Sequence, residues 1–255
     1  MTDTIDQPSV SIIMPCFNSE KYILSAITSI INQSFEAWEL LVVDAGSSDN
    51  TKNIVQGIIK DESRVKFIFN TDDKGPAHAR ATGINLARGK YIAFLDADDL
   101  WDHDKLRKQL EFMQKNGYTF SYTKFNFLHE GGHLIENKMT DIQYNFSSAL
   151  VKRGIGCLTV MIRRELLTDN IISQNNKKHG EDYLWWLLIM RSGVRAYGLN
   201  ETLASYRVTN DTLSSHKLSH YTTLWKTYRN DLSLSAWFVI RCFLLLALQK
   251  LNYRR

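Results

Sequence analysis

The chain has 255 residues, 44% of them hydrophobic and 23% charged, which is the composition of a folded protein large enough to bury a substantial core. Its net charge of +4 is unevenly placed: residues 216–255 carry seven Lys and Arg against one Asp, whereas residues 1–215 carry 24 basic and 26 acidic side chains. A neutral-to-acidic body with a basic tail lacks the basic reading surface of a nucleic-acid-binding protein, so we expect no nucleic-acid partner.

The first 118 residues alternate short apolar runs with helical patterns. The apolar runs predict buried strands, and the 3.6-residue periodicity between them predicts helices. Such an alternation is typical of an α/β fold in which a mostly parallel central sheet carries helices on both faces. The predicted strands are 10–14, 39–43, 65–69 and 91–95, and the predicted helices are 22–31, 49–59, 77–87 and 104–116.

The alternation weakens after residue 118. Segments 118–128, 159–163 and 203–208 indicate shorter, mixed strands, and a helix is predicted to begin near Asp182. No internal repeat or linker composition divides the chain. We therefore predict one domain over 1–215, with halves at about 9–118 and 119–215, followed by a basic, apolar helical extension over 216–255.

Carboxylates follow three of the predicted strands. Glu20 lies shortly after the first strand, Asp44 ends the second, and Asp96, Asp98 and Asp99 follow the fourth. The carboxyl ends of parallel strands share one edge of the sheet, where α/β folds bind their ligands. A single Asp there is often only a helix cap, but several at one edge repel each other unless a cation or hydrogen-bond donors compensate them. The group favours a binding site.

The triplet Asp96-Ala97-Asp98 indicates a metal site. Alternate residues after a strand can direct two carboxylates toward one hard cation, for which Mg²⁺ or Mn²⁺ is the expected choice. A metal held by few carboxylates completes its shell with phosphates and water, so a diphosphate ligand follows. The triplet alone is a weak signal, because it occurs by chance in many chains.

Competing motifs do not fit this segment. An EF-hand loop beginning at Asp96 needs Gly where Trp101 stands and Glu where Arg107 stands. A DxDxT phosphatase motif needs a hydroxyl or small residue where Leu100 stands. The sequence contains no P-loop and no GxGxxG after a predicted strand, which argues against a P-loop NTPase and a Rossmann dehydrogenase.

Six short motifs occur in the order and spacing of the family 2 glycosyltransferases, which the chain resembles over roughly residues 9–215. Each motif is modest alone, but six in order are specific to that family. The resemblance implies the GT-A fold, with 9–118 as the nucleotide-binding half and 119–215 as the acceptor-side half of the catalytic domain. The motifs are SIIMPCFNSE (11–20), VVDAGSSDNT (42–51), GPAHARATG (75–83), FLDADD (94–99), GEDY (180–183) and YR (206–207).

The resemblance also implies roles in a donor site. Asp44 would hydrogen-bond to the base, usually uracil, Arg80 would contact the nucleotide, and Asp98 would bind the metal that bridges the diphosphate. Two alternatives stay open: Arg80 in a surface salt bridge and Phe17 in ordinary packing. The expected nucleotide-sugar contacts are Pro15, Phe17, Asn18, Glu20, Asp44, Gly46, Ser47, Arg80, Asp96, Ala97 and Arg207, and the expected metal ligands are Asp98 and Asp96.

Asp182 matches the second acid of the family's Glu-Asp pair, which implies that it is the catalytic base. Glu181 and Asp182 lie about 100° apart on a helix, so only one can face the site, and the other is expected to stabilise the helix N-terminus. Trp185 and Trp186 follow on the same helix, where core packing is favoured over sugar stacking. The basic segment 177–179 is a solvated charge run or a loop that folds over the donor phosphates, and Thr209 stands where many relatives carry His.

Residues 236–248 are apolar except for Arg241 and are followed by Lys250, Arg254 and Arg255. This stretch is too short to span a bilayer easily. One interpretation is an interfacial helix that gives residues 232–255 a peripheral contact with an anionic membrane. The other is a helix packed on the catalytic domain or on a second copy in a homodimer.

The three cysteines, Cys16, Cys157 and Cys242, are far apart and form no CxxC pattern. This argues against a disulfide framework and fits a reducing compartment. The first apolar run, 10–14, is too short for a signal peptide and lacks a basic region before it. We therefore expect a cytoplasmic protein, peripheral on the cytoplasmic face of the inner membrane if its tail binds lipid.

We accordingly expect an inverting, metal-dependent glycosyltransferase that moves a sugar from a UDP-sugar to an acceptor hydroxyl. The resemblance alone implies a lipid-linked glycan acceptor in O-antigen, capsule or exopolysaccharide assembly. The rival functions are a nucleotidyltransferase or phosphatase using the same acidic edge, and a non-catalytic nucleotide-sugar binder. The first rival needs a phosphoryl-transfer nucleophile or a basic Gly-rich loop after the first strand, and residues 15–20 supply neither.

Overall fold

The computed structural model describes residues 7–70, 75–129, 131–136, 142–174, 180–208 and 217–252. Its strands are β1 (Val10–Cys16), β2 (Trp38–Asp44), β3 (Val65–Phe69), β4 (Tyr91–Phe94), β5 (Leu100–Trp101), β6 (Phe120–Leu128), β7 (Leu134–Glu136), β8 (Gln143–Tyr144), β9 (Met161–Arg163) and β10 (Ala196–Arg207). Its α-helices are α1 (Ile23–Ile31), α2 (Thr51–Ile59), α3 (Pro76–Leu86), α4 (Lys105–Asn116), α5 (Phe146–Val151), α6 (Asp169–Ile172), α7 (Glu181–Arg191), α8 (Lys217–Lys226) and α9 (Ala236–Asn252). Short turns of helix are η1 (Cys157–Thr159), η2 (Arg164–Leu166) and the π-helical η4 (Thr227–Asp231).

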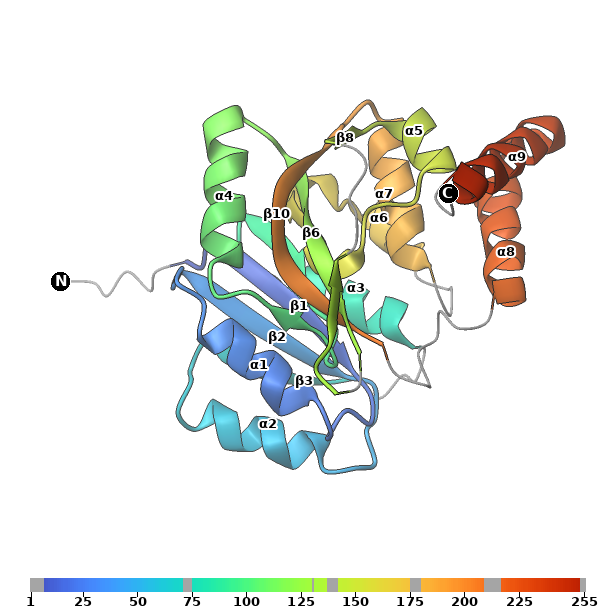
Figure 1. The fold of residues 1–255 in the computed structure, drawn as a ribbon. Coiled ribbons are helices and arrows are strands. Elements are labelled where there is room, and N and C mark those ends of the chain that lie inside the picture. Colours follow the sequence, from blue (N-terminus) through green and yellow to red (C-terminus); the bar gives the residue numbers. More distant parts are fainter. Residues whose placement is uncertain are drawn as a thin grey trace.

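The described strands form one sheet in the order β3-β2-β1-β4-β9-β6-β10-β5, with β7 added to β6 and β8 added to β10 (Figure 1). The first four strands are parallel, as the apolar runs predict. Beyond β4 the pairing is mixed, because β9 runs antiparallel to both β4 and β6 while β10 runs parallel to β6. The α/β fold is confirmed, and its parallel character is concentrated in the first half of the chain.

Helices cover both faces of the sheet and enclose two apolar cores. On one face α1, α2 and α4 pack on strand residues such as Ile12, Met14 and Leu40. On the other face α3, α5 and α7 pack on residues of the opposite parity, such as Ile13 and Leu41. Successive side chains of a strand point to opposite faces, so strands covered on both sides must be apolar throughout. This explains the unbroken apolar runs.

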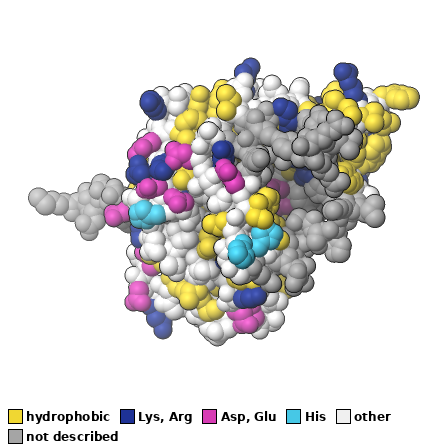
Figure 2. All heavy atoms as spheres, viewed as in Figure 1, with side chains coloured by type: hydrophobic (Ala, Val, Ile, Leu, Met, Phe, Trp, Pro, Cys, Tyr) yellow, Lys and Arg dark blue, Asp and Glu magenta, His cyan; other side chains and the backbone are white. Residues whose placement is uncertain are grey.

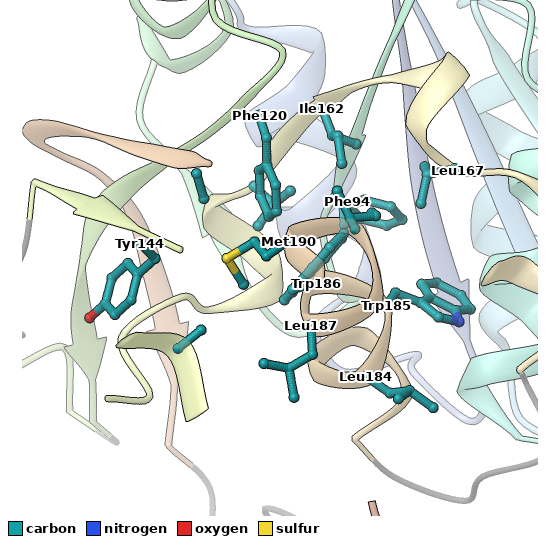
Figure 3. Packing of buried hydrophobic residues seen from close by; sticks show 14 of the residues in the cluster. Phe94, Phe120, Tyr144, Ile162, Leu167, Leu184, Trp185, Trp186, Leu187 and Met190 are labelled. Atoms are coloured by element: carbon teal, nitrogen blue, oxygen red, sulfur yellow. The ribbon is translucent and has the colours of Figure 1, made fainter. Parts of the chain in front are cut away.

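Helix α7 anchors the second core. Trp185 and Trp186 are 0% and 1% exposed, which confirms that both pack in the core (Figure 3). The Trp186 ring meets the Phe94 ring edge-on at a centroid distance of 5.6 Å and the Phe120 ring at 5.3 Å. Because these rings come from β4 and β6, the helix is held against the middle of the sheet. Its first turn is thereby placed near the strand ends.

The C-terminal helices α8 and α9 lie side by side at one end of the molecule (Figure 1). Five side chains of α8, η4, α9 and the residues between them are buried in the same core as Trp186: Leu224, Tyr228, Leu232, Val239 and Cys242. The helical character expected of the extension is confirmed. Within the described residues no helix is both long and apolar enough to cross a membrane.

Candidate active site

The carboxyl ends of β1, β2 and β4 lie side by side. Cys16 is the register partner of Asp44, and Ile13 is the partner of Phe94, after which the chain turns through Asp96 to Asp99. The backbone N–H of Leu95 still donates to Ile13 O, at 3.1 Å. The acids predicted at three strand ends therefore share one edge of the sheet.

The loops after β1 and β2 are joined by reciprocal hydrogen bonds. Ser48 N donates to Asn18 Oδ1 at 2.9 Å, and Asn18 N donates to Ser47 Oγ at 2.9 Å. Asn50 N donates to Glu20 Oε2 at 2.8 Å. The side chains of Asn18 and Glu20 thus hold the neighbouring loop, and Asn18 has a positive φ of 47° that Asn tolerates better than most residues.

Asp44 ends β2 and is 1% exposed. Its carboxylate accepts from Ser47 Oγ at 2.5 Å, from Ser47 N at 3.2 Å and from the Cys16 thiol at 3.6 Å. Gly46 lets the chain fold back with a φ of +89°, a conformation that costs glycine little. Burial, followed by the charge of Asp44, raises the pKa of the Cys16 thiol, which therefore stays protonated as a donor.

Arg80 links three segments of the site. The residue is 6% exposed, and its guanidinium donates to Asp96 Oδ1 at 2.5 Å through Nη2 and to Glu181 through Nη1. Its Nε is buried with no hydrogen-bond partner among the described residues. The ion pair with Glu181 is buried, so Arg80 is not the surface salt bridge of the alternative interpretation.

Arg207 fixes the turn that follows β4. Its backbone N–H donates to Asp99 Oδ1 at 2.8 Å, its Nε donates to Asp98 O at 2.7 Å, and its guanidinium lies 4.5 Å from the centroid of the Tyr22 ring. Asp99 is 1% exposed, and burial, followed by the charges of Asp98 and Asp96, raises its pKa well above the usual value. Asp99 is therefore a structural acceptor beside the DxD pair.

Asp96 and Asp98 are suited to a divalent cation. Burial, followed by the charge of Asp96, raises the pKa of Asp98, so the pair is strained as two anions. An added cation relieves such repulsion, and carboxylate oxygens are the ligands that Mg²⁺ and Mn²⁺ prefer. Among the described residues no group of three or more His, Cys, Asp or Glu could enclose a metal alone. The residues present therefore fit a metal that takes its remaining ligands from phosphates and water.

A cavity of about 460 Å³ has Asp96 and Asp99 in its wall, while Asp98 lies outside it. Asp182, Arg80 and Asp96 line it, and so does Glu181, which is 1% exposed and is paired with Arg80. Only one acid of the pair was expected to face the site, with the other stabilising the helix N-terminus; instead both contribute to the cavity wall, and Glu181 is held there by its ion pair with Arg80. The cavity thus brings together residues of the third, fourth, fifth and sixth motifs, whereas the first two motifs lie outside its wall.

The remaining predicted residues are distributed along the same edge. Pro15 and Ala97 are buried, and Phe17 is 55% exposed just after β1. Segment 177–179 and Thr209 lie outside the described residues. Several lining residues of the cavity were not predicted. They are Phe125, Phe127, Tyr206, Arg153, Thr223 and Thr227.

Only some of these unpredicted residues leave a signal in the sequence. Phe125 and Phe127 are two residues apart on β6, so they share one face of the strand. Their rings meet edge-on at 5.2 Å, and both rings also meet Tyr206 of β10. The alternation that places Phe125 and Phe127 on one face was therefore visible in the sequence. No local sequence pattern indicated that Arg153 or α8 would lie at the cavity.

A family model described as "Glycosyl transferase family 2" matches residues 11–168. The chain belongs to this family. A putative teichuronic acid biosynthesis glycosyltransferase, TuaG, of Bacillus subtilis is 37% identical over 224 residues, covering 88% of each chain. The Escherichia coli enzyme WfgD, a UDP-Glc:alpha-D-GlcNAc-diphosphoundecaprenol beta-1,3-glucosyltransferase, is 35% identical, covering 87% of this chain and 85% of its own.

Solved structures show that this family 2 glycosyltransferase has the GT-A fold. S. aureus TarS in complex with UDP superimposes with a TM-score of 0.72 at 20% identity, covering 94% of this chain and 70% of that one. The mannosyltransferase PcManGT from Pyrobaculum calidifontis, in complex with GDP-Man and Mn²⁺, gives a TM-score of 0.67 at 18% identity, covering 92% and 67%. The expected family and fold are confirmed, and the nucleotidyltransferase and phosphatase alternatives are set aside.

Proposed function

We propose that this glycosyltransferase moves a sugar from a UDP-sugar onto a hydroxyl of a lipid-linked glycan during assembly of a surface polysaccharide. The observation that carries the proposal is the cavity in which Asp182 lies with Arg80 and Asp96. The names of TuaG and WfgD support the pathway and the lipid-linked acceptor, and the UDP complex of TarS supports the nucleotide.

The donor site lies along the strand-end edge. Asp44 holds the base, and the loops that carry Pro15, Phe17 and Ser47 enclose base and ribose. The hydrogen bonds of Asn18 and Glu20 to the second loop support a preformed pocket, because a loop that is already ordered loses less entropy when it binds. The other proposed contacts, Gly46, Arg80, Asp96, Ala97 and Arg207, follow around the diphosphate.

Asp96 and Asp98 would hold Mg²⁺ or Mn²⁺. When bound, the metal supplies positive charge beside the diphosphate, where negative charge grows as the sugar leaves. Arg80 and Arg207 add fixed positive charge around the same turn. The protein's own contribution is to hold the Arg80 and Arg207 side chains in place before the donor binds.

Asp182 acts as the base of an inverting displacement. Its carboxylate takes the proton of the acceptor hydroxyl while that oxygen forms a bond to the anomeric carbon. The bond from this carbon to the diphosphate breaks on the opposite face, and the nucleoside diphosphate leaves with the electron pair. An α-linked donor therefore gives a β-linked product.

The C-terminal extension, 216–255, is proposed to bring the enzyme to the cytoplasmic face of the inner membrane. Exposed apolar side chains gather over α9 at the upper right of Figure 2. Trp237 is 83% exposed and Leu244 61%. The excess of six positive charges in 216–255 favours an anionic lipid surface over a second copy of this basic segment.

The test is UDP release from a panel of UDP-sugars, with Mn²⁺ or Mg²⁺, against a matched series with chelator. At least one UDP-sugar is expected to release UDP in the presence of a lipid-linked glycan acceptor, and the chelator is expected to stop this release. Turnover that survives complete chelation would remove the metal from the proposal. Failure of every UDP-sugar to bind or react would remove the donor assignment.

A further inference from the structure

The C-terminal extension forms part of the wall of the cavity that contains Asp182. Thr223 of α8 and Thr227 of η4 line this cavity. At the start of α7, a Cβ on Gly180 would lie 3.9 Å from Thr223 Cγ2. The extension and the start of α7 therefore lie against each other at the cavity.

Hydrogen bonds join the extension to the residue after Asp182. The hydroxyls of Tyr183 and Tyr228 lie 2.8 Å apart. The two hydroxyls share two protons among this contact and two backbone carbonyls, since Tyr183 Oη lies 2.8 Å from Ala149 O and Tyr228 Oη lies 2.5 Å from Leu150 O. Both acceptors belong to α5, so α5, α7 and η4 meet at one point beside the cavity.

Arg153 lies at this meeting point, two residues beyond the end of α5. Its guanidinium is 4.7 Å from the centroid of the Tyr183 ring, and it lines the cavity from an exposed position. A guanidinium that packs over a ring still carries its N–H donors in its own plane, in a fork that matches phosphate oxygens. Arg153 therefore places a group that can donate hydrogen bonds to a phosphate against Tyr183, the residue that follows the proposed base.

The exposed apolar face of α9 begins on the other side of the same point. Burial raises the pKa of the Tyr183 hydroxyl, the Tyr228 hydrogen bond and the charge of Arg153 lower it, and Cys242 of α9 is near enough to add to the increase. Val239 and Cys242 are buried, whereas Trp237, Ile240 and Leu244 lie on the opposite side of the helix and are at least 40% exposed. From the cavity outward, the chain therefore presents the Asp182 carboxylate, then the Arg153 guanidinium, and then the exposed apolar face of α9.

We propose that Arg153 binds a phosphate group of the acceptor, and that the acceptor is a sugar carried on a lipid phosphate. This inference rests on the proposed function. In such an acceptor the reacting hydroxyl, the phosphate and the hydrocarbon chain follow one another in the same order as Asp182, Arg153 and α9. The sugar is held against α8 and η4, so Thr223 and Thr227 contribute to acceptor selection.

The test measures binding to protein that is already saturated with UDP and Mg²⁺. A first titration with UDP alone establishes the donor site, so a failure of the proposed function is seen separately. Three probes are then titrated by calorimetry: decyl diphosphate below its micelle concentration, inorganic pyrophosphate, and neutral decyl glucoside. The variants are Arg153→Gln, Arg153→Lys as a charge-conserving change, and Arg195→Gln as a control at an exposed arginine outside the cavity.

Decyl diphosphate is expected to bind more tightly than inorganic pyrophosphate, because only the first also has a hydrocarbon chain for α9. Arg153→Gln is expected to weaken the binding of decyl diphosphate by about 10- to 100-fold, the range of a charge-assisted hydrogen-bonded pair, while Arg153→Lys recovers part of it. Arg195→Gln is expected to change it less than about threefold.

Equal losses for decyl diphosphate and decyl glucoside in Arg153→Gln would mean that Arg153 only supports the fold, and would overturn the proposal. Wild-type protein that ignores decyl diphosphate would overturn it as well. Equal affinities for decyl diphosphate and pyrophosphate would reject the lipid part and identify a free phosphate compound as the ligand.

Discussion

The guanidinium of Arg80, on α3, donates to the carboxylate of Glu181, in the first turn of α7, although 101 residues separate them in the chain. The same guanidinium holds Asp96 at 2.5 Å. The helix that presents Asp182 is therefore tied by one side chain to the turn that follows β4. Any shift of α7 moves the proposed base relative to the proposed metal ligands.

Breaking this link is expected to cost both stability and activity. Arg80→Met leaves Glu181 buried without its cation, and removal of one partner of a buried pair typically costs about 3–5 kcal/mol. Urea unfolding measures the loss. The double variant Arg80→Met/Glu181→Leu is expected to regain most of the stability but no activity, because the link to Asp96 remains absent. An Arg80→Met protein as stable as wild type would contradict the buried ion pair.

Asp182→Asn is expected to lower kcat by about 10²- to 10⁴-fold, the contribution of a positioned base, with UDP-sugar binding unchanged within about threefold. The amide keeps the shape of the side chain but accepts no proton. Asp169→Asn, at an exposed acid of α6 outside the cavity, is the matched control. Full activity in Asp182→Asn, with the control also active, would require a different base.

The lowered pKa of Lys105 is expected to make the free energy of unfolding rise with pH. This lysine is fully buried in α4, donates to Gln109 at 2.7 Å and lies 4.2 Å from the centroid of the Trp101 ring. Burial lowers its pKa from 10.5 to about 7. Between these values the unfolded chain binds a proton that the folded chain does not, so the free energy of unfolding increases with pH by up to about 1.4 kcal/mol per unit.

Lys105→Met is expected to be more stable than wild type near pH 7 and to lack this increase between pH 7 and 10. Chemical denaturation of both proteins at several pH values measures the difference, in which the titrations of all other groups cancel. Parallel stability curves for the two proteins would show that Lys105 stays charged in the folded state.

Leu244→Asp is expected to abolish sedimentation with phosphatidylglycerol vesicles and leave turnover of a soluble acceptor unchanged. The charge places an ion where the proposal puts hydrocarbon. Leu134→Asp, at a residue of β7 that is 56% exposed, is the matched control and should sediment as wild type does. Light scattering decides the alternative: a wild-type dimer that Leu244→Asp dissociates would assign the exposed face of α9 to a second copy.

Local sequence patterns were sufficient for the parallel half of the sheet. The strands ending at Cys16 and Asp44 are long, largely apolar runs, because both faces of each strand are buried. The short strands β5, β7 and β8 were not predicted, since two or three residues are too few to show a period of two. β10 begins at Ala196, seven residues before the predicted strand, because its first half is only partly buried and shows no continuous apolar run.

The candidate site residues could be named from the order of the motifs, because each motif is a short segment that is matched without knowledge of the fold; their roles stay predictions. The relationships between motifs were not readable. That Arg80 holds both Asp96 and Glu181, and that Arg153 and Thr223 lie beside Asp182, depends on packing between segments far apart in the chain. The linear pattern records which faces must be buried, whereas the partner of each buried charge is selected only when those faces close on one another.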